Sequence, residues 1–392
     1  MTNILILDGN QRSALATTRS LGRHGLNLFV GDVTRVSLAG SSRYCRTQMR
    51  LPDPSDSTDL FIKELAAAIT RHHIDVVMPM TDISTATILE YRSDLSQIRL
   101  PCPSLESYQA ASNKFELFRH AQALGIPVPH TIFVDNDSEF EPATIDLEYP
   151  LIIKPAHSHY LSGKQWISTQ VQVAYSRDEL IQLVNRSSWL QDKPFMVQQF
   201  ISGHGAGLFA LYNHGQPVVQ FYHQRIREKP PGGGVSVLSE SIPVNEDMRQ
   251  IADSLLTDLR WHGPAMVEFK VAENGTPYLM EINGRFWGSL QLAIDAGVDF
   301  PYLAYLIATG QDIPQVPDYK IGVRNRWLLG DLDRLYLVIK NRNGEYNVRR
   351  KFYELFEFMK FFQKYTRYEV NRFDDYRPFL FELKEYVKAL FK

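Results

Sequence analysis

Residues 265–283 read AMVEFKVAENGTPYLMEIN, and this stretch decides the fold. Two apolar runs, residues 265–271 and 277–282, flank Glu273-Asn274-Gly275, a turn sequence that strongly favours a β-hairpin. In an antiparallel pair, residues near opposite positions can place their side chains on one face of the sheet. The stretch therefore predicts a hairpin in which side chains from opposite positions of the two strands lie together on one face.

Three polar side chains lie on this hairpin. Glu268 and Glu281 stand inside the two apolar runs, and Asn283 follows Glu281 by two positions, hence on the same strand face. Two buried carboxylates repel each other and lose hydration unless a cation lies between them. Two carboxylates and an amide oxygen suit Mg²⁺, with Mn²⁺ as an alternative. Solvent-facing glutamates are the other interpretation, and the apolar flanking residues argue against it.

Two lysines have unusual settings. Lys154 lies in LIIKP between apolar neighbours, where a lone buried ammonium is costly and needs an anionic partner such as a phosphate. Lys114 precedes a helical pattern in SNKFELF, where Ser112 or Asn113 can cap. An exposed lysine at a helix start is the alternative for Lys114.

Outside the hairpin, strand and helix patterns alternate through the first hundred residues, which implies a parallel α/β sheet. The turn after the first strand, GNQRSA, lacks the GxGxxG pattern, so no dinucleotide is expected there. Predicted strands cover residues 3–8, 26–31, 74–80, 150–155 and 195–201, and predicted helices cover 13–24, 60–71 and 114–124.

Composition excludes several classes of protein. The chain has 392 residues, 44% hydrophobic and 22% charged, which is ordinary for a globular protein of two or three domains. Its two cysteines, Cys45 and Cys102, exclude a disulfide scaffold. The sequence MTNILILDGN is no signal peptide, and no apolar run approaches the ~18 residues of a spanning helix. We expect a cytoplasmic enzyme or binding protein.

The near-zero net charge of −2 hides a split along the chain. Residues 1–319 carry 25 basic and 34 acidic side chains, whereas residues 320–392 carry 17 basic and 10 acidic ones. The same tail holds 17 of the 46 aromatic residues. A basic, aromatic tail indicates either a polyanionic or membrane-surface partner, or a helical layer packed on the body.

In their order, these motifs resemble the ATP-grasp superfamily. The motifs are Asn113-Lys114 before a helix ending in GIPVP, then PLIIKP, MVQQFISG, VEFK and LMEINGRFWGS. The resemblance spans about residues 1–313. This part of the chain is similar to the ATP-grasp domains of biotin carboxylase and carbamoyl-phosphate synthetase. The nearest subgroup is the ATP-dependent carboxylate ligases often called "carboligases", through GHGAGLFAL, RIREKPPGGGVSVLSES and WHGPAMVEFK.

The resemblance implies an α/β fold class with an α+β ATP-grasp core. It implies a Rossmann-like parallel-sheet domain at residues 1–105, a small lobe at 106–194, a large lobe with the metal and catalytic residues at 195–315, and a helical extension at 316–392. ATP and Mg²⁺ are the implied cofactors. The implied ATP-binding residues are Lys114, Lys154, Gln198, Gln199, Phe200 and Ile201; the metal ligands are Glu268, Glu281 and Asn283; the catalytic arginines are Arg225 and Arg285.

Two segments depart from the family pattern or add to it. Relatives carry a run of glycines after the second lysine, whereas residues 156–166 read AHSHYLSGKQW, so closure of this lid over the phosphates must differ. The run KPPGGGV at residues 229–235 predicts either a tight corner or a loop whose backbone N–H groups hold a substrate anion. The candidate substrate residues are Gly232, Gly233, Gly234, Ser239 and Glu240. Asp82 stands at the carboxyl end of a predicted strand, where open α/β sheets bind ligands, and a helix cap is the more strongly expected of its two roles.

The implied activity is ATP-dependent ligation of a carboxylate to an amine through an acyl phosphate, with small-molecule substrates and no nucleic acid. The alternatives are an ATP-grasp enzyme that attaches an amino acid to a surface polysaccharide or uronic acid, and a regulatory nucleotide-binding protein without catalysis. In the tail, residues 352–362 are apolar over a wide arc. Three interpretations of this apolar arc are open: it packs against a homodimer partner, it contacts a membrane, or it contacts no second surface.

Overall fold

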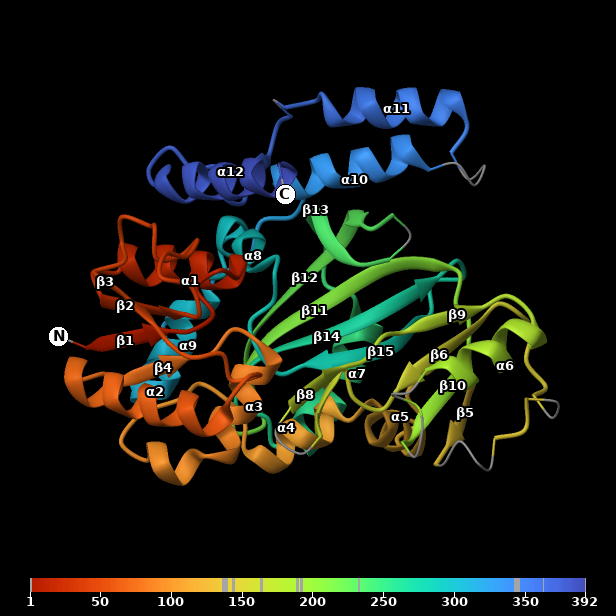
Figure 1. The fold of residues 1–392 in the computed structure, drawn as a ribbon, viewed down its shortest axis with the longest axis horizontal. Coiled ribbons are helices and arrows are strands. Elements are labelled where there is room, and N and C mark those ends of the chain that lie inside the picture. Colours follow the sequence, from red (N-terminus) through yellow and green to blue (C-terminus); the bar gives the residue numbers. More distant parts are fainter. Residues whose placement is uncertain are drawn as a thin grey trace.

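The computed structural model describes residues 2–135, 140–142, 145–162, 165–187, 190, 193–231, 233–341, 346–361 and 363–391. It contains a parallel sheet of four strands, an antiparallel sheet of four strands, a two-stranded hairpin and a large sheet of seven strands. The α/β fold class with an α+β core is therefore confirmed (Figure 1).

The N-terminal sheet has the order β3-β2-β1-β4 with all pairs parallel. Helix α1 connects β1 to β2 and helix α2 connects β3 to β4, since a parallel pair needs a crossover connection, whereas β2 and β3 are joined by turns without a helix. Of the four strands, β3 was not predicted, since Thr-Gln-Met-Arg holds a single apolar residue. The elements are β1 (Asn3–Ile6), α1 (Arg12–Arg23), β2 (Asn27–Asp32), β3 (Thr47–Arg50), α2 (Thr58–His72), β4 (Val76–Met78), α3 (Asp82–Glu90) and η1 (Arg92–Leu95).

The next unit begins with two helices and forms the antiparallel sheet, in the order β5-β10-β6-β9. The predicted strands at 150–155 and 195–201 are present and pair directly with each other. A separate hairpin, β7–β8, stands beside this sheet. The elements are α4 (Leu105–Ser112), α5 (Lys114–Ala123), β5 (Thr131–Val134), β6 (Leu151–Pro155), β7 (His159–Ser162), β8 (Gln165–Ser168), β9 (Gln172–Ala174), α6 (Arg177–Arg186) and β10 (Phe195–Gln199).

The seven-stranded sheet has the order β15-β14-β11-β12-β13-β16-β17. The predicted hairpin is β14–β15, and Gly275 takes a φ of +88° in its turn. The elements are β11 (Gly203–Asn213), β12 (Gln216–Lys229), β13 (Val235–Ser241), α7 (Glu246–Asp258), β14 (Gly263–Ala272), β15 (Pro277–Asn283), α8 (Leu290–Ala296) and α9 (Phe300–Thr309).

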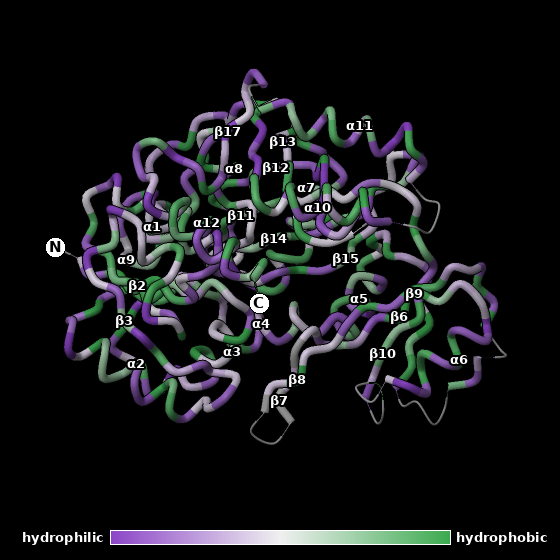
Figure 2. Tube along the Cα trace, turned by 45° about the horizontal axis from the view of Figure 1, so that its top comes forward, coloured by the Kyte–Doolittle hydropathy of each residue, from purple (hydrophilic) through white to green (hydrophobic). Residues whose placement is uncertain are grey.

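The C-terminal extension is mostly helical, as expected, and it also adds two strands to the large sheet. They are β16 (Arg324–Arg326) and β17 (Thr366–Tyr368), and the helices are α10 (Leu328–Lys340), α11 (Val348–Phe358) and α12 (Arg377–Leu390). Figure 1 shows these helices as a layer of their own. Figure 2 shows α11 at the rim, with apolar and polar positions interleaved. The four domain limits predicted above stay a prediction.

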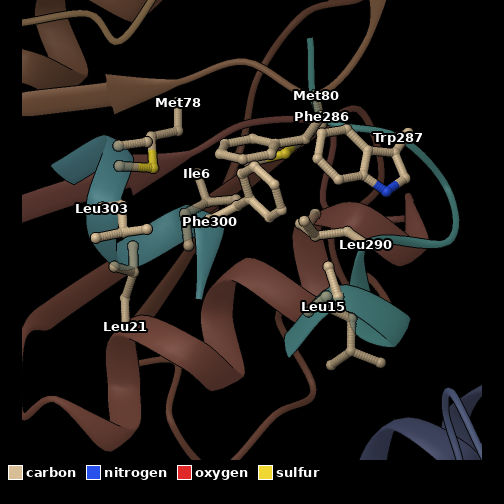
Figure 3. Packing of buried hydrophobic residues seen from close by; sticks show 14 of the residues in the cluster. Ile6, Leu15, Leu21, Met78, Met80, Phe286, Trp287, Leu290, Phe300 and Leu303 are labelled. Atoms are coloured by element: carbon tan, nitrogen blue, oxygen red, sulfur yellow. The ribbon is translucent and has the colours of Figure 1, made fainter. Parts of the chain in front are cut away.

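A shared hydrophobic core joins the N-terminal sheet to the large lobe. The aromatic rings of Trp287 and Phe300 meet edge to face at 5.0 Å in this core. Figure 3 shows the side chains that α1, the sheet, α8 and α9 bring together, among them Ile6, Leu15, Leu21, Met78, Leu290, Phe300 and Leu303.

No single helix in the described ranges has the length and apolar character needed to cross a membrane. The helices α8 and α9 meet those criteria only as a pair bent by 95°.

Candidate active site

The hairpin brings the predicted metal set together. Glu268 on β14 pairs directly with Glu281 on β15, and the ladder changes register just after Glu268. The Asn283 side-chain amide donates to Glu281 Oε1 at 3.0 Å. Among the described residues no group of three or more His, Cys, Asp and Glu side chains is placed to hold a metal. The set is thus two carboxylates and one amide, which are oxygen donors of the kind that Mg²⁺ accepts.

The two predicted lysines reach the same place from the other lobe. Lys114, at the first turn of α5, lies with Nζ 3.1 Å from Glu281 Oε2 and donates to Ser158 Oγ at 2.5 Å. Lys154, on β6, donates to the carbonyl of Met280 at 3.2 Å. Both side chains are buried, with a residue exposure of 7% each. The exposed-lysine alternative for Lys114 is therefore wrong.

The pKa values of these groups show how strongly they act on each other. Burial lowers the pKa of Lys154 to about 8, although Glu281 partly offsets this. Burial also opposes the charge of Glu281, but Lys114 and Asn283 outweigh it and lower the Glu281 pKa to about 2. For Glu268, burial raises the pKa in spite of Arg225. Bringing a divalent cation between the two carboxylates would favour their charged forms.

Arg225 on β12 stands against the same carboxylates. Its Nη2 lies 2.7 Å from Glu268 Oε2, and its Nη1 lies 3.1 Å from Glu228 Oε1. Burial works against the charge on Arg225, but Glu268 and Glu228 together raise its pKa. The guanidinium therefore stays charged beside the metal set, where it balances Glu268.

Arg285 follows the hairpin and links it to the N-terminal sheet. Its Nη2 lies 3.0 Å from Asp82 Oδ2 and 3.4 Å from Asn283 Oδ1. The expectation that Asp82 caps a helix is wrong, because Thr81 is the N-cap of α3 and forms a capping box with Ser84. Asp82 lies in the first turn instead, where its carboxylate is free to pair with Arg285.

The predicted hinge lies where β10 ends. Gln198 is 2% exposed, and its Nε2 donates to Thr131 Oγ1 at 2.9 Å, so its amide faces the small-lobe sheet. Gln199 is exposed, and Phe200 is 45% exposed. Gln199 still uses its N–H to bond the His130 carbonyl at 2.9 Å. Of the two glutamines, only Gln199 therefore has an exposed side chain.

Part of the glycine loop after β12 contacts the site. Gly232 lies outside the described residues. Gly234 takes a φ of +147°, and a Cβ there would stand 2.3 Å from the Lys229 carbonyl oxygen, which explains the need for glycine. The Gly234 carbonyl accepts from Arg225 Nη1 at 3.3 Å. The loop thus touches a catalytic candidate.

The remaining substrate candidates fall on both faces of β13. Gly233 is exposed, and Ser239 is buried at the position opposite Arg225 in the ladder. Glu240 is opposite Gln224 and binds Arg324 Nε at 2.8 Å. Since side chains alternate along a strand, Ser239 shares the Arg225 face and Glu240 lies on the other face.

Two site contacts were not predicted. Ser158, in the lid segment, accepts from Lys114, and Asp82 pairs with Arg285. Both lie far in sequence from the residues they touch, so spacing gave no signal for either contact. For Asp82 the usable signal was its place at the carboxyl end of a parallel strand, where open α/β sheets bind ligands. Part of the lid, residues 163–164, lies outside the described residues.

Two cavities adjoin these groups and share Asp82 in their walls. The smaller, of about 220 Å³, is lined by Lys114, Ser158, Glu281 and Asn283 together with lid residues such as Trp166. The larger, of about 860 Å³, lies between the N-terminal sheet, Arg285 and the C-terminal extension. The ion pair of Asp82 and Arg285 thus stands where the two cavities approach each other.

Part of the chain is similar in sequence to known proteins. Residues 191–330 match the family model described as "ATP-grasp in the biosynthetic pathway with Ter operon". The carbamoyl phosphate synthase large chain of Pyrococcus furiosus is 26% identical over 206 residues, which cover 51% of this chain and 19% of that relative. This chain therefore spans only about a fifth of the length of that curated relative.

Solved structures with the same fold extend the likeness over most of the chain. An L-amino acid ligase from Bacillus licheniformis has a TM-score of 0.61 and 19% identity, covering 79% of this chain and 74% of that one. The biotin carboxylase domain of 2-oxoglutarate carboxylase from Hydrogenobacter thermophilus has a TM-score of 0.63 and 11% identity, covering 82% and 73%. With its matched sequence, its sheets and its lysine and carboxylate cluster, this chain contains an ATP-grasp domain homologous to that of carbamoyl phosphate synthase.

Proposed function

We propose that this protein is an ATP- and Mg²⁺-dependent ligase that joins a carboxylate to an amine through an acyl phosphate. One observation carries the proposal: Lys114 and Arg225 contact Glu281 and Glu268 directly, on a hairpin that also presents Asn283. The related carboxylase domain was solved with MgADP, which supports the choice of nucleotide and metal. The related amino acid ligase supports the choice of substrates.

In this proposal the nucleotide lies between the two lobes. The end of β10 at Gln199, with the exposed Phe200 and the half-buried Ile201 that follow, meets the base through backbone groups, and the buried Gln198 lies behind it. Lys114 and Lys154 neutralise phosphate charge, and a bound phosphate restores the proton that burial makes Lys154 prone to lose. Glu268, Glu281 and Asn283 would hold the metal, which would supply positive charge beside the phosphate oxygens.

The reaction then has two steps. A carboxylate oxygen of the first substrate attacks the γ-phosphorus of ATP, the bond to the ADP oxygen breaks, and an acyl phosphate results. The amine nitrogen of the second substrate attacks the acyl carbon, loses a proton and displaces phosphate, leaving an amide. Arg225 and Arg285 flank the metal set and stabilise the charge that develops on the phosphoryl oxygens. The 860 Å³ cavity beside Arg285 has room for both substrates.

The test is ADP release by the full chain across a panel of amino acids, dipeptides and uronic acids with Mg²⁺. We expect release only when a carboxylate and an amine are both present. The double substitution Glu281→Gln with Asn283→Ala removes two metal ligands, so we expect the rate to fall by at least about a thousandfold. Hydroxylamine should intercept the acyl phosphate as a hydroxamate when the amine is left out.

The matched control is Glu273→Gln, which changes an exposed carboxylate in the turn of the same hairpin. This variant should release ADP at the rate of the parent. Turnover by the Glu281/Asn283 variant equal to that of the parent would show that the metal assignment is wrong. Binding of MgATP with no ADP release across the whole panel would favour a regulatory protein instead.

A further inference from the structure

The helix α11 leaves most of its apolar side chains in solvent. Of its described residues only Glu354 and Phe358 are buried. The exposed apolar residues recur at helical spacing, so they form one stripe along the helix. Their exposure runs from 39% to 71%, and they are Val348, Phe352, Leu355, Phe356 and Met359. A stripe of this size on a helix that is already packed on one side indicates a second surface that covers it.

The exposed charges of the extension are mostly basic, and Arg349, Arg350 and Lys364 lie on α11 or within six residues of its end. Within the described part of residues 328–391, exposed acidic residues are limited to Asp374 and Glu385. The exposed basic residues of the same range are Lys340, Arg349, Arg350, Lys364, Arg367, Arg377, Lys384 and Lys388. The outer face of the extension therefore combines apolar side chains with positive charge.

Folding itself produces this face, because the acidic residues of the extension turn inward. Asp331 is fully buried and lies 2.7 Å from both Arg227 and Arg326. Glu354, on the inner side of α11, lies 2.9 Å from Arg334. Asp331 links the layer to β12 of the body through Arg227, and Glu354 links α11 to α10 through Arg334, so most of the remaining bases stay outside. The exterior is consequently more positive than the composition of the tail suggests.

Charge and side-chain chemistry together select the covering surface. A symmetric dimer would place this basic face against itself, which like charges oppose. Single-stranded nucleic acid gains from aromatic stacking but little from aliphatic residues such as Val348, Leu355 and Met359. A lipid bilayer with anionic headgroups takes up both features, since acyl chains receive the apolar stripe and headgroups pair with the bases.

We propose that the protein docks on anionic lipid membranes through α11, with its apolar stripe inserted at the headgroup level. This interaction is independent of the ligase chemistry, because the stripe lies outside both cavities described above. The interaction is peripheral and reversible. Its strength combines the buried apolar area with the electrostatic attraction of the flanking bases, so it weakens as salt increases.

The test is sedimentation of the full chain with vesicles of phosphatidylcholine alone and of phosphatidylcholine mixed with phosphatidylglycerol. We expect binding only to the mixed vesicles. Phe352→Ser with Phe356→Ser should weaken that binding at least about tenfold, since two aromatic side chains lose their apolar environment. Arg349→Gln with Lys364→Gln should weaken it about fivefold for each charge removed. A Phe356→Trp variant should gain fluorescence quenching by brominated lipid relative to the parent.

The matched control is Val36→Ser with Val171→Ser, two valines that are 54% and 52% exposed and lie between β2 and β3 and between β8 and β9, outside the C-terminal extension. It should bind vesicles like the parent. The proposal is overturned if the parent ignores the mixed vesicles, or if the phenylalanine pair has no more effect than the valine pair. The proposal is also overturned if light scattering shows that the parent forms dimers, the phenylalanine variant loses these dimers, and neither protein binds vesicles. That result would assign the stripe to self-association.

Discussion

Lys154 has no charged partner within ion-pair distance among the described residues. Its ammonium donates to one carbonyl, that of Met280, and lies 5.0 Å from the centre of the Phe118 ring. The two glutamates of the hairpin act on it only at longer range, and its pKa falls to about 8 through burial. A buried ammonium held this loosely is ready to bind an anion that arrives from outside.

This setting predicts proton uptake when nucleotide binds. Near pH 9 the free protein has Lys154 largely neutral, and a bound phosphate raises its pKa and recharges it, so close to one proton should be taken up. At about pH 6.5 the lysine is already charged, and no uptake is expected from it. The measurement is titration calorimetry with MgADP in buffers of different ionisation enthalpy.

Lys154→Arg supplies the control, because a guanidinium stays charged throughout this range. Nucleotide should still bind to this variant, with no proton taken up at about pH 9. If the parent and the arginine variant took up the same number of protons there, another group would be responsible and the role of Lys154 in phosphate binding would be rejected.

Single residues show what sequence could predict about this site. Lys154 was recognisable because its charge interrupts an apolar run, and the glutamate pair because both lie in apolar strands around one turn. The pairing of Asp82 with Arg285 was not recognisable, since Asp82 follows the N-terminal sheet and Arg285 follows the hairpin β14–β15, and nothing local in either sequence requires the contact. Such a contact depends on how the N-terminal sheet packs against the large lobe.

The same holds for secondary-structure elements. The hairpin β14–β15 follows from its own turn and its apolar alternation, which are local properties. The strand β16 reads Arg-Asn-Arg, a polar sequence with no strand pattern, and was missed. It pairs with β13, more than 80 positions earlier, and its Arg326 is 1% exposed and binds Asp331 and the Phe358 carbonyl, 5 and 32 positions away. Buried charge of this kind looks like surface charge in a sequence.

The helix α1 attaches the extension to the N-terminal sheet through a second buried charge. Arg19 donates to Asp375 Oδ2 at 2.9 Å and to the carbonyls of Glu369, Val370 and Asp375. Both charged side chains of the pair are completely buried. The contact bridges more than 350 positions in sequence and fixes the segment between β17 and α12 against α1. The loss of either charge would leave the other buried and uncompensated.

Arg19→Met should therefore lower the free energy of unfolding by about 3–5 kcal/mol, since it strands Asp375 in the interior. Arg23→Met is the matched control on the same helix: Arg23 pairs with Asp374 at 2.7 Å, but both side chains are largely exposed, so the loss should be at most about 1 kcal/mol. Urea unfolding measures both values, and limited proteolysis should release the extension earlier in Arg19→Met. Equal stability of the two variants would contradict a locking role for Arg19.

At the scale of the whole molecule, the extension closes the large cavity. Trp327, Asp333, Phe381 and Glu382 line it opposite the N-terminal sheet, so three separate parts of the chain form its walls. The surface that the extension turns to the cavity is thus partly acidic, while its exposed face is basic. The net charge of −2 is the sum of −9 over residues 1–319 and +7 over residues 320–392, so it describes neither part of the chain.

Glu382, in the wall of this cavity, couples the docking of the extension to pH. Burial raises its pKa to about 7, although Trp327 Nε1 donates to its Oε1 at 2.7 Å, and no described residue gives its buried Oε2 a hydrogen bond. The unfolded chain holds this proton only below a pH of about 4.3, so the folded protein should lose stability as pH rises from there to about 7.

Glu382→Gln removes this pH dependence of stability. The variant should be about 1–2 kcal/mol more stable than the parent near pH 8, a value reduced for partial solvent contact. Urea unfolding across this pH range measures both slopes, with the exposed Glu64→Gln as the control that should follow the parent. A Glu382→Gln slope as steep as that of the parent would show that Glu382 is already charged in the folded wall, and that the docked extension tolerates a carboxylate there.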